Sequence, residues 1–164
     1  MAGPMPFKRK PRLPDFDYRG CHRYFVTICT DGKQLLFVDD TKVKKILDVL
    51  ADESRKHGFV VWGYCFMPDH LHLLLEGEGI DADMKAFVKI FKQKTGYQHR
   101  KETTRITGRL WQPSYYDRVL RGDEDLQGAL RYILNNPVRK GLVSHFADYR
   151  YLGSFAVDVR DIAF

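Results

Sequence analysis

The sequence predicts an α+β fold, a ferredoxin-like sandwich in which helices cover one face of a central antiparallel β-sheet. Segments rich in aromatic and β-branched residues alternate with segments whose apolar residues have helical spacing. Their order along the chain is strand, helix, strand, strand, helix, strand, helix, and only residues 67–69 separate the two middle strands. The other face of the sheet is expected to be bare and available for a ligand.

The first half of the chain contains three strands and one helix by these criteria. Residues 22–29 are aromatic and β-branched, which is typical of a strand. Residues 41–57 repeat apolar side chains at helical spacing, and Gly58 marks the end of that helix. Residues 59–66 and the segment that begins at His70 are again strand-like, and the short connection between them predicts a hairpin.

The second half continues the alternation. A helix capped by Asp81 or Asp83 is expected next, because apolar residues and lysines each recur there at helical spacing. Residues 95–109 are rich in arginine and glycine and predict a basic loop. Strand character returns in residues 110–120. A last helix is expected in residues 124–135. It is expected to end there because Pro137 disfavours its continuation.

The composition indicates one basic globular domain. The chain has 164 residues, with 27 Lys and Arg against 21 Asp and Glu, and the net charge of +6 favours a polyanionic partner such as nucleic acid. Three cysteines without Cys-x-x-Cys spacing argue against a disulfide framework or a thiolate zinc site. No apolar run approaches the roughly 18 residues that a membrane span needs, so a cytoplasmic protein without a membrane partner is expected.

Two histidines at positions 70 and 72 are the most informative chemical feature. On a strand, residues i and i+2 share a face about 6.5–7 Å apart, so both rings can reach one metal ion. The leucines at 71, 73 and 75 would then be buried on the opposite face, and the histidines would be left open. The alternative is a pair of histidines at a sheet edge that are bonded to backbone.

Two histidines leave a metal under-coordinated, so a further donor is expected from elsewhere in the fold. The last helix offers one, because Tyr132 and Asn136 are four residues apart and therefore lie one above the other on the same flank. A phenol and an amide oxygen would face the same place.

Three blocks of the sequence together resemble a known family. They read FMPDHLHLL at 66–74, LWQPSYYDR at 110–118 and YILNNPVRKGL at 132–142. In these blocks, and in their order, the chain resembles the HUH-type single-strand DNA transposases, and most closely their REP-associated tyrosine transposase branch.

The resemblance implies a function and a set of roles. His70 and His72 would bind a divalent metal, Mg²⁺ or Mn²⁺, with Asn136 as the third ligand, and Tyr132 would be the nucleophile. The enzyme would cleave and rejoin hairpin-containing single-stranded DNA through a 5′-phosphotyrosine intermediate, as a monomer or a homodimer. Residues 21–150 would form the transposase domain, preceded by a basic, partly ordered arm at 1–20 and followed by a C-terminal tail at 151–164.

Several assignments have rivals. Tyr115 and Tyr116 are alternative phenols, and alternation along a strand would place one in the core and leave the other to stack on a base. Asp69 either orients the His70 imidazole or merely forms the turn after Pro68. Basic residues that are expected to contact DNA, or else are ordinary exposed charges, are Lys85, Lys89, Lys92, Arg118, Arg121, Arg131 and Arg139.

Two other functions are compatible with the same residues. The first is a non-catalytic protein that binds structured single-stranded nucleic acid. The second is a metal phosphoesterase that uses water and forms no covalent link to DNA.

Overall fold

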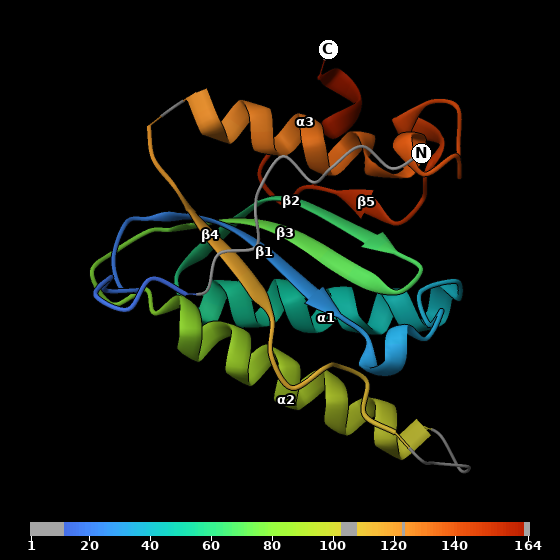
Figure 1. Cartoon of the computed structure of the whole chain (residues 1–164), viewed down its shortest axis with the longest axis horizontal. Helices are drawn as coiled ribbons and strands as arrows, with labels where there is room; N and C mark the ends of the chain where they lie inside the picture. Colours follow the sequence, from blue (N-terminus) through green and yellow to red (C-terminus); the bar gives the residue numbers. More distant parts are fainter. Residues whose placement is uncertain (1–11, 103–107, 123, 163–164) are drawn as a thin grey trace.

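The computed structural model describes residues 12–102, 108–122 and 124–162. In this part of the chain, one antiparallel sheet has the strand order β4-β1-β3-β2-β5 (Figure 1). The strands are β1 (Arg23–Cys29), β2 (Phe59–Met67), β3 (His70–Gly77), β4 (Tyr116–Leu120) and β5 (Leu152–Gly153). The α-helices are α1 (Asp40–Lys56), α2 (Met84–Glu102) and α3 (Glu124–Arg139), and short 3₁₀ helices are η1 (Asp31–Lys33), η2 (Phe146–Asp148) and η3 (Val159–Asp161).

The predicted α+β class is confirmed. The first four strands and the first two helices follow the order β1-α1-β2-β3-α2-β4 of a ferredoxin-like sandwich. The predicted hairpin forms, since β2 and β3 pair in antiparallel register on either side of a turn at Pro68 and Asp69. The other edge of β3 pairs with β1, which brings Cys29 opposite His70.

Helices α1 and α2 cover one face of the sheet, as expected (Figure 1). The leucines at 71, 73 and 75 are fully buried there, together with alternate residues of β1 and the apolar seams of both helices. Burying one such side chain stabilises the fold by about 1.5–3 kcal/mol, so this layer is the main source of stability. Asp83 caps α2 by accepting a hydrogen bond from the Ala86 backbone N–H at 3.0 Å.

The structure differs from the sequence prediction on the second face, which is not bare. Helix α3 lies against it (Figure 1), and its Ala129 and Ile133 pack in a second core with Phe25, Cys65 and Leu74. Gly63 permits this close approach, because a Cβ atom at that position would lie 2.8 Å from Leu130 Cδ1. The physical reason is that the β3 residue beyond the histidines, Leu74, and its neighbours on this face are apolar and need a cover.

Helix α3 also continues through Pro137 to Arg139, so the expected end before the proline is wrong. The stop signal is Gly141, whose positive φ of 70° is the left-handed conformation that favours glycine. The Gly141 N–H bonds to the Val138 carbonyl at 2.9 Å and the Leu142 N–H bonds to the Pro137 carbonyl at 2.9 Å. This pair of bonds is a Schellman motif, and Pro137 removes one helical hydrogen bond, the one to the Ile133 carbonyl, without ending the helix.

Other boundaries also move. Helix α2 extends to Glu102, so residues 95–102 of the expected basic loop are helical, while 103–107 lie outside the described residues. The expected strand at 110–120 is regular only in β4, although Trp111 makes an isolated bridge to Thr30. Residues 1–11 of the expected arm also lie outside the described part. No helix among the described residues combines the length and apolarity that crossing a membrane requires.

Candidate active site

The two histidine rings converge at the start of β3. The His70 Nε2 and His72 Nε2 atoms are 3.1 Å apart, and the rings are nearly perpendicular, with an interplanar angle of 80°. The shared face that the two-residue period predicts is therefore observed. The expectation that both rings are open is wrong, because α3 covers this face: the His72 residue is only 1% exposed, and the His70 side chain is 16% exposed.

Each imidazole is held by its other nitrogen. His70 Nδ1 lies 2.5 Å from Asp69 Oδ1, and His72 Nδ1 lies 2.8 Å from Thr27 Oγ1. A carboxylate only accepts hydrogen bonds, so His70 donates its Nδ1–H to Asp69 and its Nε2 atom carries the lone pair. His72 has the same tautomer when its Nδ1–H is donated to the Thr27 oxygen. Asp69 thus sits in the turn and also contacts the imidazole. Such outer partners are the usual way in which metal-binding histidines are oriented.

The charge state also suits metal binding. Burial lowers the pKa of His70, against the opposing effect of Asp69, and burial together with the neighbouring His70 lowers the pKa of His72 well below its usual range. Both rings are therefore neutral at pH 7. Neutral imidazoles with free Nε2 lone pairs are metal ligands, whereas imidazolium ions are not.

Tyr132 comes from α3 and lies over the same face. Its ring centroid is 6.2 Å from that of His72 and 5.7 Å from that of Phe25. The Arg139 guanidinium carbon lies 3.8 Å from the centroid of the Tyr132 ring, in a cation–π contact. One chain thus brings together the phenol and the histidines.

Asn136 lies one turn after Tyr132 and is buried, with only 3% of its surface exposed. Its Oδ1 accepts a hydrogen bond from Arg139 Nη2 at 3.4 Å. Because α3 continues past this residue, the i,i+4 relationship to Tyr132 holds despite the following proline.

Lys33 is a residue near the site that the sequence analysis missed. It is the only non-glycine residue with positive φ (57°) in the described part of the chain, and its Nζ donates to Cys29 Sγ at 3.2 Å. Cys29 is the cross-strand partner of His70, and the positive charge of Lys33 contributes to the lowered pKa of both histidines. The signal that could have found it is the Gly32-Lys33 turn directly after the first strand.

The basic residues predicted to contact DNA fall into two groups. Arg118 is on the α3 side of the sheet, since it pairs with Phe25 across β1 and β4, and Arg131 and Arg139 are on α3 itself. Arg121 is exposed just after β4. The lysines at 85, 89 and 92 lie on α2, on the opposite face of the sheet from the histidines.

The rival tyrosines separate as alternation predicts. Tyr115 packs on the main core, and burial raises its pKa to about 12. Tyr116 is 40% exposed and pairs with Thr27, so it lies on the histidine side of the sheet. The Tyr132 ring contacts the ring of His72.

A metal would need more than the histidine pair. Among the described residues, no three or more His, Cys, Asp or Glu side chains are grouped to hold an ion. The two imidazole nitrogens leave positions for further donors such as water or phosphate oxygens, and Asn136 on α3 is the residue that the sequence predicts as a third ligand. This donor set fits Mn²⁺ well and Mg²⁺ less well, because Mg²⁺ prefers oxygen ligands.

Comparison with known proteins identifies the family. The model of the family described as "Transposase IS200 like" matches residues 19–136, which include the histidine strand, Tyr132 and Asn136. The chain belongs to this family of transposases. It is 25% identical over 124 residues to the REP-associated tyrosine transposase of Escherichia coli, covering 75% of this chain and 68% of that protein.

Two further similarities agree with this assignment. A Haemophilus influenzae protein whose name places it among the REP-associated tyrosine transposases is 27% identical over 146 residues, covering 84% of this chain and 81% of the relative. A solved structure of a REP-associated tyrosine transposase bound to a REP hairpin matches with a TM-score of 0.70 at 18% identity. It covers 87% of this chain and 82% of the other, and the likeness is one of fold. The predicted resemblance is thereby confirmed, and the transposase is an enzyme of the tyrosine class.

Proposed function

We propose that this transposase cleaves and rejoins hairpin-containing single-stranded DNA through a 5′-phosphotyrosine at Tyr132. The observation that carries the proposal is the position of the Tyr132 ring, 6.2 Å from the ring of His72, whose Nε2 converges with that of His70. A nucleophile next to a pair of metal-ligand nitrogens is the arrangement that phosphoryl transfer by a tyrosine needs.

The proposed step is a substitution at phosphorus. The Tyr132 Oη atom attacks the scissile phosphate and loses its proton to water, the bond from phosphorus to the 3′ oxygen breaks, and that oxygen takes up a proton. The DNA 5′ phosphate is then joined to Tyr132, and the other fragment ends in a 3′ hydroxyl. Attack by a second 3′ hydroxyl on the phosphotyrosine reverses the step and joins the strands without ATP.

Residues around the phenol have defined parts in this step. Arg139, stacked on the Tyr132 ring, holds the phenol in place and puts a positive charge next to the phosphate. Thr27 and Asp69 keep the Nε2 atoms of the two histidines directed at each other. A divalent cation, Mg²⁺ or Mn²⁺, held by His70, His72 and Asn136, would supply the charge that polarises the scissile phosphate.

A hairpin substrate is supported by the relative of like fold that is bound to a REP hairpin and by the net charge of +6. Residues 21–150 are the proposed catalytic domain, with residues 1–20 as a basic arm and 151–164 as a tail. Arg118, Arg121 and Arg131 are proposed to contact backbone phosphates on the α3 side of the sheet.

The test is covalent trapping. The protein is incubated with Mn²⁺ and labelled hairpin DNA that has single-stranded flanks, and the products are separated under denaturing conditions. We expect a labelled protein band with the wild type and none with Tyr132→Phe, while Tyr116→Phe, the matched control on the same side of the sheet, keeps the band. Mass spectrometry then identifies the peptide that carries the nucleotide.

The same experiment separates the rival functions. A protein that only binds DNA gives no cleavage with any variant. A water-using phosphoesterase cleaves the DNA without labelling the protein, and its rate is insensitive to Tyr132→Phe. Either result contradicts the proposed function.

A further inference from the structure

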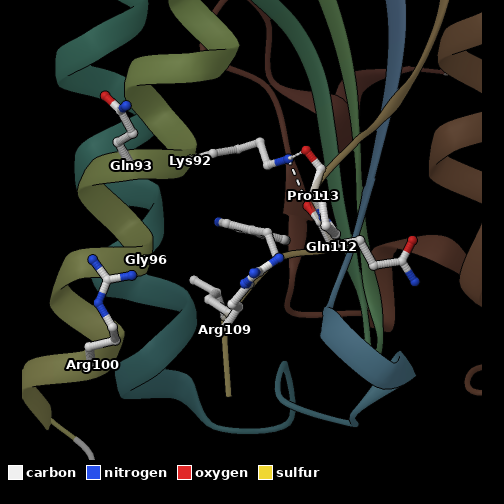
Figure 2. Close-up of a pocket in the computed structure, with 9 residues that line it drawn as sticks. Lys92, Gln93, Gly96, Arg100, Arg109, Gln112 and Pro113 are labelled. Atoms are coloured by element: carbon white, nitrogen blue, oxygen red, sulfur yellow. Dashed lines mark hydrogen bonds between the residues drawn. The ribbon is translucent and has the colours of Figure 1, made fainter. Parts of the chain in front are cut away.

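A basic cavity outside the histidine site lies between the second half of α2 and the segment 109–113 that leads to β4. Its volume is about 260 Å³, and Figure 2 shows the residues that line it. Lys92 and Arg100 come from α2, and Arg109 lies on the opposite wall (Figure 2). No Asp or Glu is among the lining residues.

The two guanidinium groups are not used elsewhere in the described part of the chain. Arg100 and Arg109 form no ion pair with any described residue, whereas Lys92 donates to three backbone carbonyls. Two guanidinium groups at one cavity without a carboxylate repel each other, and a bound anion removes that repulsion. Guanidinium donors match phosphate oxygens in geometry.

The walls of the cavity are built rather than incidental. Lys92 Nζ bonds to the carbonyls of Gln112, Pro113 and Ser114 at 2.8, 3.2 and 3.1 Å and so fastens this segment to α2. Trp111 is buried, and its Nε1 donates to Thr95 Oγ1 at 2.8 Å. The segment that carries Arg109 is thus held at a fixed distance from α2.

Gly96 supplies a second, independent observation. Glycine inside a helix costs about 1 kcal/mol relative to alanine, so its presence in the middle of α2 calls for a local reason. A Cβ atom at Gly96 would meet no atom within 4 Å, and Gly96 lines the cavity. The missing side chain therefore leaves room for a ligand and does not relieve a packing clash.

The cavity and the histidine pair share one end of the sheet. The Gln112 backbone N–H donates to the Cys29 carbonyl at 2.9 Å, and Cys29 is the cross-strand partner of His70. The Gln112 side chain points away from α2 (Figure 2). The end of β1 and this short segment thus lie between the two sites, which are on opposite faces of the sheet, and a DNA strand that leaves the histidines would pass around this end of the sheet to reach the arginines.

We propose that this cavity binds a backbone phosphate in the single-stranded part of the DNA, close to the nucleotides that occupy the histidine site. The proposal rests on the function proposed above. A phosphate is the expected group because the donors are guanidinium ions and the nearby Trp111 ring, 4% exposed, cannot stack on a base. The substrate at this position is single-stranded because it continues the strand that reaches Tyr132.

The test is a binding measurement with EDTA present, which does not depend on cleavage. The variant Arg100→Gln/Arg109→Gln is compared with Lys44→Gln/Arg55→Gln, which removes two exposed charges from α1. The probes are a labelled hairpin with a single-stranded extension, the same hairpin without it, and deoxynucleoside monophosphate. We expect the double arginine variant to bind the extended hairpin about 10-fold more weakly and to bind the bare hairpin with wild-type affinity. The slope of the logarithm of the binding constant against the logarithm of the salt concentration should be smaller by about 0.7 for each phosphate that the protein no longer neutralises.

A second variant tests the space at Gly96. Leucine favours a helix more than glycine, so Gly96→Leu is expected to fold at least as stably as wild type and yet to bind the extended hairpin several-fold more weakly. Three results would overturn the proposal. Every variant could bind both hairpins equally, or the variants could lose the same affinity for both hairpins. The protein could also bind the monophosphate as tightly as it binds the extended hairpin. A Tyr132→Phe protein that still cleaves would refute the catalytic proposal alone, because this binding comparison is independent of it.

Discussion

Replacing Thr27 by valine tests whether the outer partner of His72 matters. The two side chains have the same shape, so Thr27→Val keeps the packing of β1 against β3 and removes only the hydroxyl, which lies 2.8 Å from His72 Nδ1. His72 is 1% exposed, so water cannot replace the lost partner. A buried polar group left without a partner costs about 1–3 kcal/mol, and we expect the free energy of unfolding to fall by that amount.

The same change should weaken metal binding. Loss of the partner that orients a ligand imidazole typically lowers metal affinity by about 10–100-fold, and calorimetry with Mn²⁺ measures this directly. Thr27→Ser, which retains the hydroxyl, is the control and should keep most of both properties. If urea denaturation and Mn²⁺ titration both give wild-type values for Thr27→Val, the hydrogen bond does not orient His72 and the argument for the metal site loses its support.

Two further changes test the fold. Burial opposes ionisation of Glu53, but Lys94, Lys56 and His57 outweigh this effect and hold the pKa of Glu53 below its usual value. The stabilising effect of the ionised carboxylate is therefore present above about pH 4.3 and is lost as the pH falls through the lowered pKa. Glu53→Gln should flatten the acid side of a curve of unfolding free energy against pH, and an unchanged acid side would contradict this. Gly141→Ala should lower the free energy of unfolding by about 1 kcal/mol in urea denaturation, because alanine is strained at a φ of 70°, and an unchanged midpoint would argue against the Schellman end of α3.

The histidine pair and the phenol could be predicted because both depend on local periodicity. The two-residue period of a strand places His70 and His72 on one face, and the helical period places Tyr132 above Asn136. That these two elements meet is predicted by the need for a further metal donor and by the family resemblance, since no local pattern specifies which face of a sheet a distant helix covers.

The position of α3 was missed although a signal was present. Residues 59–67 are almost continuously apolar, which is typical of a strand that is buried on both faces, whereas the prediction of a bare face followed the alternation of histidines and leucines at 70–75. The extent of α2 was missed because Gly96 and the arginines around it are more typical of a loop. Lys33 and the arginine cavity depend on contacts between segments far apart in sequence, which periodicity does not report.

The helix that covers the sheet also restricts the approach to the catalytic groups. His72 is closed off beneath α3, while His70, at the end of its strand, is still partly accessible. A DNA strand that reaches the metal ligands would then have to approach past His70, and a bendable single strand can do so more easily than a stiff duplex. Selectivity for single-stranded DNA at the catalytic groups would follow from this restricted access before any base is read.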